Sequence, residues 1–401
     1  MSIRILAISL WLSVAAFGSP DAEKALEESW HVAKRDIYPA SLESKFTDVE
    51  YRKLMDRATE AADLEAFAPH YRSFLSTLEM SHNEIGTTND WLYYLFRSQS
   101  DIGEPKVFHI GVQSRPGTNG ARVHNVLEGY PGERLKRGDV ILSANGKPFQ
   151  MVDSFDSGNS VELQVQRGSK IINLNIEPVL DSPHESLLLA MQQSVKAWKW
   201  KQFKFGYVHL WSGTHEKIAE RFIEIIDSMN DYDGIVLDLR DGYGGAGYEY
   251  LDPFFADRQQ YIEMETVDRN GKTVVQKIPP IKKSHQYFKG KLVVLVNEGV
   301  RSGKELMAYQ LKQSRRAVLI GSRTAGAVTA GRIKVFDDPK FALMFSNLGV
   351  RLNGKVLEGV GVAPDILVDW SVDHALPWDP QLLVARTMLQ EVTQNDPDKG
   401  D

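Results

Sequence analysis

Among the features of this 401-residue sequence, one stretch limits the possible folds more than any other. It lies at residues 293–305 and reads VVLVNEGVRSGKE. Its first four residues are apolar and rich in β-branched side chains, which predicts a strand buried on both faces. Asn297 and Gly299 interrupt this strand, and a helical pattern begins at Ser302. Because N–H groups at a helix start are unpaired and carry partial positive charge, an oxyanion beside Ser302 would find donors there. The stretch therefore predicts a serine nucleophile at a strand-to-helix junction.

The same residues also permit a purely structural interpretation. Ser302 and Glu305 form an S-x-x-E capping box, in which the serine hydroxyl only starts the helix. The two interpretations are compatible, because a nucleophile can lie at a helix N-terminus. The choice depends on whether the rest of the chain supplies a base, an oxyanion hole and a substrate groove.

Composition excludes several classes of protein. A hydrophobic fraction of 42% and a charged fraction of 25% are typical of a globular protein, and the length predicts two to three domains. The net charge of −6 argues against nucleic-acid binding, and the lack of cysteine excludes disulfides, thiolate metal sites and a cysteine nucleophile. His215-Glu216 begins an H-E pair, but Ala219 occupies the place of the second zincin histidine. We expect no metal site and no cofactor.

The first residues have the pattern of a targeting segment. Arg4 precedes an apolar run at residues 5–17, and small residues follow near position 18. This pattern predicts a secretory signal peptide at residues 1–18, with an uncleaved N-terminal anchor as the alternative. No later segment approaches the length of a membrane span. The expected location is periplasmic or secreted, with no stable membrane span after processing.

The rest of the chain divides by its pattern. Residues 21–103 are helical in pattern, and His82 is expected at a helix end, where histidine commonly acts as a cap. Residues 104–180 read as short strands and turns. Residues 181–390 alternate strands with helices, which predicts a mostly parallel α/β sheet. Residues 391–401 are expected to form a polar tail.

The β-rich segment carries a recognisable phrase, LKRGDVILSANGKPF, in which Asn145-Gly146 is a hairpin signal. In its order of strands and in this phrase, the segment at residues 104–180 resembles a PDZ domain. The resemblance implies that an extended peptide binds there as an added strand, often by its C-terminal carboxylate. The alternative is a small β-domain without a ligand.

A glycine-rich stretch follows the predicted strand at residues 234–240. Gly242, Gly244 and Gly247 match the G-x-G-x-x-G pattern of dinucleotide-binding proteins, which alone is weak evidence. The stretch could instead be a turn whose N–H groups face a neighbouring nucleophile, or a tight connection with no chemical role.

Four phrases occur in one order behind the PDZ-like segment: GIVLDLRDGYGG, VVLVNEGVRSGKE, LIGSRTAG and EGVGVAPDI. Together they resemble the C-terminal processing (tail-specific) serine peptidases and their relatives, the tricorn-type proteases. The resemblance covers about residues 108–368. It implies a ClpP/crotonase-like α/β peptidase core with an inserted PDZ domain, and it assigns the nucleophile to Ser302.

One departure from this family decides the subtype. The processing peptidases use a serine–lysine dyad, and the position of their lysine is Ala327 here. Lys304 is a poor substitute, because residues i and i+2 of a helix point away from each other. The tricorn-type branch instead uses a histidine base that follows a serine and is oriented by a glutamate.

The resemblance to that branch assigns the remaining roles. Ser81-His82 matches its serine–histidine pair, and Glu358 in the LEGVGVAPD phrase matches its glutamate. His82 would take the proton of Ser302 and later protonate the leaving amine, while Glu358 would fix the imidazole tautomer. The oxyanion would be held by the N–H groups of Gly303 and of Gly244 or Gly245.

The sequence therefore predicts an exported serine endopeptidase that acts on unfolded or C-terminally presented polypeptides, with a polypeptide substrate as its partner and a possible homo-oligomeric state. The first alternative is a non-catalytic peptide-binding protein that retains the peptidase fold, and it is motivated by Ala327. The second is a nucleotide-dependent enzyme, and it rests only on the glycine stretch at residues 242–247.

Overall fold

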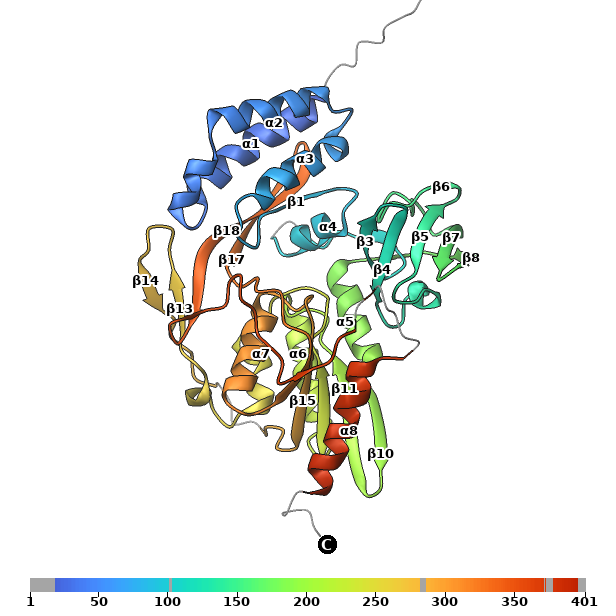
Figure 1. The fold of residues 1–401 in the computed structure, drawn as a ribbon, viewed down its shortest axis with the longest axis vertical. Helices are drawn as coiled ribbons and strands as arrows, with labels where there is room; N and C mark the ends of the chain where they lie inside the picture. The colour runs from blue at the N-terminus through green and yellow to red at the C-terminus, as the bar shows by residue number, and fades with distance from the viewer. Residues whose placement is uncertain (1–18, 101–102, 282–285, 371, 373–377, 396–401) are drawn as a thin grey trace, which may run out of the picture.

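The central element of the fold is a six-stranded sheet with the strand order β10-β11-β12-β15-β16-β20 (Figure 1). The structure is a computed structural model that describes residues 19–100, 103–281, 286–370, 372 and 378–395. Only the β10–β11 pairing is antiparallel within this sheet; the other four are parallel. The bounds are β10 (Lys196–Trp200), β11 (Phe203–His209), β12 (Gly234–Asp238), β15 (Lys291–Val296), β16 (Val318–Gly321) and β20 (Ile366–Leu367).

Helices cover both faces of this sheet. Val293 and Leu295 pack in a cluster with residues of helix α8, whereas Val294 and Val296 pack with residues of α5, α6 and α7. All four side chains are at most 3% exposed, which confirms the prediction of a strand buried on both faces. The helices are α5 (Pro183–Ser194), α6 (Glu216–Asp227), α7 (Gly303–Gln313) and α8 (Pro380–Gln394).

The mostly parallel sheet predicted for residues 181–390 is present only as the central sheet, and the prediction is not confirmed for the other sheets. Outside the central sheet, every pairing between described strands is antiparallel. The long strand β18 (Lys340–Leu352) organises the second sheet, because the other strands of that sheet, except β14, all pair with it. Its neighbours are β1 (Glu84–Thr87), β13 (Met264–Val267), β14 (Thr273–Val275), β17 (Ala330–Asp337) and β19 (Lys355–Val356). The sequence pattern missed this sheet because its strands are scattered along the chain.

The N-terminal helices pack on the far end of the β17–β18 hairpin (Figure 1). Phe341 and Phe345 of β18 lie in one buried cluster with Trp30 and Phe74 of these helices. The region around His82 differs from the prediction of a helix end followed by a loop. Helix α3 ends at Ser76, and the next element is strand β1, so His82 lies in the turn between them with φ 62°. The helices are α1 (Pro20–Asp36), α2 (Asp48–Glu60), α3 (Leu64–Ser76) and α4 (Trp91–Ser98).

The β-rich segment forms its own sheet, in the order β3-β4-β5-β7-β8 with β6 beside β5. The hairpin predicted at Asn145-Gly146 joins β5 to β6, and both residues have positive φ values of 48° and 75°. A short pair, β2–β9, joins this sheet to the rest of the chain. The bounds are β2 (Val107–His109), β3 (Val112–Gly117), β4 (Gly120–Val126), β5 (Val140–Ala144), β6 (Lys147–Pro148), β7 (Val161–Arg167), β8 (Lys170–Ile176) and β9 (Val179–Asp181).

The predictions for the two ends of the chain can be compared with the structure only in part. The signal peptide predicted at residues 1–18 lies outside the described residues. Helix α8 continues to Gln394, so the first residues of the segment expected as a polar tail are helical. Among the helices of the described residues, none is both long enough and apolar enough to cross a bilayer.

Candidate active site

The candidate nucleophile lies at the carboxyl edge of the central sheet. Strands β12 and β15 are parallel neighbours, so the loops that follow Asp238 and Val296 leave the sheet at the same edge. The first loop carries the glycine stretch, and the second leads to Ser302 at the N-terminus of α7. The fold therefore brings together two segments that are separated by more than 50 residues in the chain.

Ser302 has a strained backbone and a hydroxyl that does not cap its helix. Its φ and ψ are 58° and −133°, a combination that non-glycine residues rarely adopt. Its side chain makes no cap hydrogen bond, so the capping-box interpretation is wrong for the serine hydroxyl. Glu305 instead accepts hydrogen bonds from the N–H groups of Gly326 and Ala327, both at 2.7 Å. The Ser302 N–H donates to the Ala327 carbonyl at 2.7 Å. Strain that leaves a hydroxyl uncommitted is typical of a functional serine.

The glycine stretch packs directly on this serine. A Cβ at Gly244 would lie 2.5 Å from Ser302 Cβ and 3.1 Å from its Oγ, and one at Gly303 would lie 1.7 Å from the Gly245 carbonyl oxygen. Only glycine fits these approaches. Within the described residues, the N–H groups of Gly244, Gly245 and Gly303 donate no hydrogen bond, so they are available to an oxyanion. A three-residue 3₁₀ turn (Tyr248–Tyr250) follows the loop, so the dinucleotide interpretation lacks its phosphate-binding helix.

Lys304 is buried behind the glycine loop and does not face the nucleophile. Its side chain is 0% exposed, and Nζ donates to the carbonyls of Leu210, Trp211 and Asp241 at 3.2, 3.3 and 2.5 Å. Burial lowers the pKa of Lys304 to about 7, although Asp241 and Asp238 oppose the shift. This geometry agrees with the prediction that Lys304 is not the base. The lysine instead fixes the backbone on which the glycine loop is built.

The second part of the site is a hydrogen-bonded network around His82. Ser81 Oγ donates to Glu358 Oε2 at 3.0 Å and lies 2.8 Å from His82 Nδ1. Because the serine proton is directed to the carboxylate, the network assigns the imidazole proton to Nδ1 and leaves the Nε2 lone pair free. Glu358 also accepts from the N–H groups of Ser81 at 2.7 Å, Val328 at 2.8 Å and Thr329 at 2.9 Å. Four donors thus hold this carboxylate in one position.

Two features of this network differ from the sequence interpretation. Glu358 was expected to orient the imidazole directly, but in the structure it acts through the Ser81 hydroxyl. Thr329 was not predicted at all, although its Oγ1 lies 2.8 Å from Ser81 Oγ and 3.4 Å from His82 Nδ1. The only sequence signal for Thr329 was its hydroxyl two residues after Ala327. That position alone does not indicate that the side chain lies near His82.

The two parts of the site are connected by short contacts. Arg301, which precedes the candidate nucleophile, forms an ion pair of 2.9 Å with Glu84, two residues after His82. The segment at residues 327–329 touches both parts, through the Ala327 carbonyl and the Val328 and Thr329 N–H groups. Within the described residues, no hydrogen bond joins Ser302 to His82. The candidate base and the candidate nucleophile therefore lie in neighbouring segments, and their direct contact remains a prediction.

The environment of His82 favours its neutral form. The side chain is only 7% exposed. Burial and then the charge of Arg301 lower the pKa of His82 to about 4, against the opposite effects of Glu84 and Glu358. A neutral imidazole with a free Nε2 can accept a proton, as a general base must.

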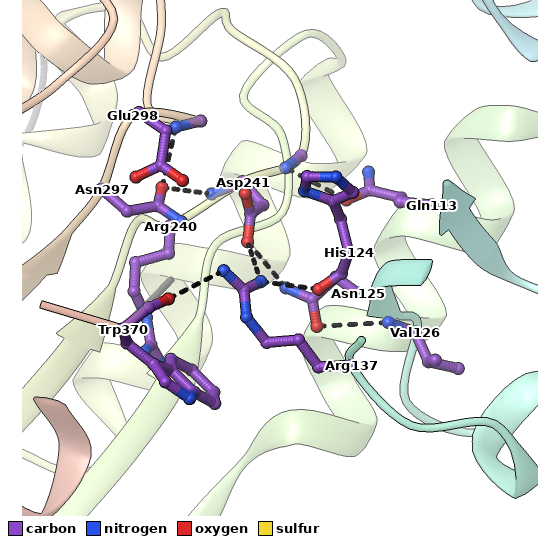
Figure 2. Close-up of polar contacts among 12 residues, drawn as sticks. Gln113, His124, Asn125, Val126, Arg137, Arg240, Asp241, Asn297, Glu298 and Trp370 are labelled. Atoms are coloured by element: carbon purple, nitrogen blue, oxygen red, sulfur yellow. Dashed lines mark hydrogen bonds and ion pairs between the residues drawn. The ribbon is translucent and has the colours of Figure 1, made fainter. Parts of the chain in front are cut away.

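The PDZ-like sheet docks beside the glycine loop through Asp241 (Figure 2). Asp241 Oδ2 accepts a hydrogen bond from Asn125 Nδ2 at 3.0 Å and lies 3.6 Å from Arg137 Nη1, while its N–H donates to Asn297 Oδ1 at 3.1 Å. Gly242 adds a weaker contact from its N–H to Gln113 Oε1 at 3.4 Å. One residue thus joins the PDZ-like sheet, the glycine loop and the loop that leads to Ser302.

A cavity of about 310 Å³ lies at this junction. Its lining combines the start of strand β3, at Val112 and Gln113, with Tyr243, Arg301 and Ala327 of the central domain. Strand β3 is an edge strand of its sheet, so its outer backbone groups can pair with an added strand. The cavity thus extends from the β3 edge to Arg301 and Ala327, which adjoin Ser302.

The Arg137 contact gives a testable prediction about how the two domains are held. Arg137 Nη1 also donates to the His124 carbonyl at 2.6 Å, and its guanidinium lies 4.7 Å from the Trp370 ring centroid. Its side chain is 12% exposed and that of Asp241 is 10% exposed. Arg137→Gln removes this buried charge and should lower the free energy of unfolding by about 2 kcal/mol, measured by urea denaturation. Lys147→Gln, on the exposed strand β6 of the same domain, should change it by less than about 0.5 kcal/mol.

Comparison with known proteins agrees with this architecture. Residues 204–368 match the family model of peptidase family S41, and residues 109–177 match the family model of the PDZ domain. The chain is 25% identical over 370 residues to carboxyl-terminal-processing peptidase 3, chloroplastic, of Arabidopsis thaliana, covering 86% of this chain and 68% of that protein. It is 25% identical to the carboxy-terminal processing protease CtpA of Bacillus subtilis, covering 67% and 58%. It is 22% identical to the tricorn protease of Thermoplasma volcanium, covering 97% and 38%. The chain thus spans less than two thirds of the latter two relatives.

Solved structures show the same fold. The photosystem II D1 C-terminal processing protease superposes with a TM-score of 0.56 at 18% identity, covering 94% of this chain and 98% of that one. A tricorn protease structure superposes with a TM-score of 0.54 at 18% identity, covering 94% and 37%. None of these matches is described as ClpP-like or crotonase-like, so that part of the fold prediction is not confirmed. The fold and these matches indicate a serine peptidase that carries a PDZ domain. More particularly, residues 204–368 are similar to peptidase family S41, and residues 109–177 are similar to PDZ domains.

Proposed function

We propose that the protein is an exported serine endopeptidase that cleaves unfolded or C-terminally presented polypeptides through an acyl-enzyme at Ser302. The observation that carries this proposal is the pairing of a strained, uncapped serine with a hydrogen-bonded serine–histidine–glutamate network on the neighbouring segment. The proposed catalytic residues are Ser302 and His82, with Ser81 and Glu358 as positioning residues.

The chemistry follows from the two states of the imidazole. His82 Nε2 would accept the proton of Ser302 Oγ as the oxygen attacks the carbonyl carbon of the scissile bond. The charged imidazolium would then be stabilised through Ser81 by Glu358, and it would protonate the leaving amine. The N–H groups of Gly303 and of Gly244 or Gly245 would hold the oxyanion. A small movement of the turn that carries His82 would complete the contact with Ser302, because catalytic hydrogen bonds often tighten only when substrate is bound.

The proposed route of the substrate uses the domain junction. A chain paired with the β3 edge would lie in the cavity that also touches Arg301 and Ala327, the neighbours of Ser302. Residues 110–111 immediately precede this edge, and PDZ domains often bind the C-terminal carboxylate of the added chain. This arrangement supports presentation of an extended chain, since a folded substrate could not pair along the strand.

The non-catalytic alternative rested on Ala327, which stands in the place of a lysine base. The proposed histidine base would make that lysine unnecessary, and the hydrogen-bonded, neutral His82 supports this proposal. A fluorophosphonate probe distinguishes the two proposals. Covalent labelling at Ser302, located by peptide mass spectrometry, supports the peptidase, whereas lack of labelling in a folded sample would favour the peptide-binding protein.

The buried histidine also predicts a pH dependence. Since the pKa of His82 is lowered to about 4, the base stays neutral over the whole physiological range, and kcat/KM should fall only on the acid side. We expect a plateau from about pH 5.5 to 8 and an acid limb near pH 4 to 5. A limb with its midpoint at about 6.5 would indicate an exposed histidine and would contradict this geometry.

The same shift affects stability, which must be measured in parallel. Between pH 6.5 and 4, the unfolded chain binds a proton at this histidine that the folded chain does not. The free energy of unfolding should therefore decrease as the pH falls through that window, by up to about 1.4 kcal/mol per pH unit from this residue. Tryptophan fluorescence at each pH separates loss of the base from loss of the fold.

A further inference from the structure

Three side chains from distant parts of the sequence meet below the PDZ domain. Each of Glu104, His184 and His215 places one potential ligand atom within 4.8 Å of those of the other two. Glu104 Oε1 lies 3.5 Å from His215 Nε2, and the two imidazole rings have centroids 4.4 Å apart. Glu104 precedes strand β2, His184 lies in the first turn of α5, and His215 is the N-cap of α6.

A second observation indicates that one member of this cluster lacks a partner. His184 is 3% exposed, and its Nδ1 is a buried atom with no hydrogen-bond partner. Its other ring nitrogen, Nε2, lies 3.5 Å from Ser98 Oγ. Buried polar atoms without partners are rare because their desolvation is not repaid. An imidazole nitrogen left in this condition is a ready metal ligand.

We propose that Glu104, His184 and His215 bind one first-row divalent cation, and that Zn²⁺ fits them best. Two imidazole nitrogens and one carboxylate oxygen form a ligand set typical of zinc, whereas Mg²⁺ and Ca²⁺ prefer oxygen ligands alone. The fourth position would be taken by water. This inference is independent of the proposed function, because none of the three residues belongs to the Ser302 or His82 network.

The surroundings support this assignment of ligands. Ser182 Oγ lies 3.4 Å from Glu104 Oε2, which leaves Oε1 directed to the histidines. Binding at His215 Nε2 would move its proton to Nδ1 and end the present 3.2 Å hydrogen bond from the Lys217 N–H.

The position of the site indicates what the ion would do. The PDZ domain is connected to the rest of the chain through the β2–β9 strand pair. Glu104 lies just before β2, and His184 follows β9 by three residues. An ion held by these residues and by His215 would fasten both connections of the PDZ domain to helix α6. The site would therefore be structural, a clamp at the base of the PDZ domain.

The sequence predicts no metal site, because the His215-Glu216 pair has Ala219 where a second histidine on the same helix would be needed. The ligands found here come from three separate elements, so no spacing along the chain reports them.

Titration of the untagged, metal-free chain tests the proposal. Co²⁺ should bind with one equivalent per chain and give visible absorption bands, and Zn²⁺ should displace it. Glu104→Gln should weaken Co²⁺ binding by about tenfold or more, and His184→Ala should weaken it further. His31→Ala, at an exposed histidine on α1, should bind as the unmodified chain does.

Thermal denaturation supplies a second measurement that needs no activity. Zn²⁺ should raise the Tm of the unmodified chain and of His31→Ala, but not that of Glu104→Gln. Glu104 is exposed, so this variant should fold even if His184→Ala does not. Lack of Co²⁺ binding at 1:1 stoichiometry, or equal binding by Glu104→Gln and the unmodified chain, would overturn the proposal.

Discussion

Replacement of Ser302 by alanine is expected to reduce kcat for hydrolysis of an unfolded polypeptide by roughly 10⁴- to 10⁶-fold. The reason is that the variant loses the hydroxyl oxygen that lies both at the strained N-cap of α7 and against Gly244. Alanine keeps the Cβ and the backbone conformation, so the fold and the free energy of unfolding should hardly change. Cleavage of an unfolded protein, followed by gel electrophoresis or mass spectrometry, gives the measurement.

Two further variants make this result specific. Ser314→Ala, at the other end of α7, should retain full activity, because its hydroxyl only caps the helix by donating to the Gln310 carbonyl. Ser302→Gly should be inactive but more stable than the unmodified chain by about 1 kcal/mol, since glycine adopts a φ of 58° without strain. Substantial activity in Ser302→Ala would place the nucleophile elsewhere, and a destabilised Ser302→Gly would show that its conformation is not strained.

Replacement of His82 by alanine should have the second largest effect, a loss of roughly 10³- to 10⁶-fold in kcat. No other described histidine lies within the network formed by Ser81, Thr329 and Glu358. Labelling by a fluorophosphonate should slow by a similar factor, because the probe also requires an activated Ser302. His70→Ala, at an exposed position on α3, is the matched control and should behave as the unmodified chain.

Replacement of a positioning residue should reduce kcat less than replacement of Ser302 or His82 does. Ser81→Ala interrupts the connection from His82 Nδ1 to Glu358, so the tautomer is no longer fixed. We expect a loss of roughly 10- to 100-fold in kcat with little change in KM, and a displaced acid limb of the pH profile. If Lys304→Met abolished turnover while His82→Ala did not, the assignment of a histidine base would be wrong.

Several parts of this protein could be predicted because they depend on local pattern. The run at residues 293–296 had to be a buried strand, since four consecutive apolar side chains cannot face water on either side. Asn145-Gly146 had to turn, because few residues tolerate two consecutive positive φ values. Ser302 was identifiable from its place between a strand and a helix, and from its resemblance to a family.

Other parts escaped prediction because they depend on pairing between distant segments. Strand β18 draws together β1, β13, β17 and β19, and nothing in a local pattern indicates which strands will pair. The contribution of Thr329 and the indirect role of Glu358 also depend on where loops converge, so sequence could name the glutamate but could not show that it acts through Ser81.

The sequence alone supplied the residue types available for catalysis, the strand-to-helix junction at Ser302, and the prediction of histidine rather than lysine as the base. The backbone strain at Ser302, the approach of Gly244 to it, and the burial that keeps His82 neutral exist only in the folded chain. The physical reason is the range of the interactions concerned. Helix and strand patterns arise from neighbours along the chain, whereas strain, burial and pKa arise from groups that meet only after folding.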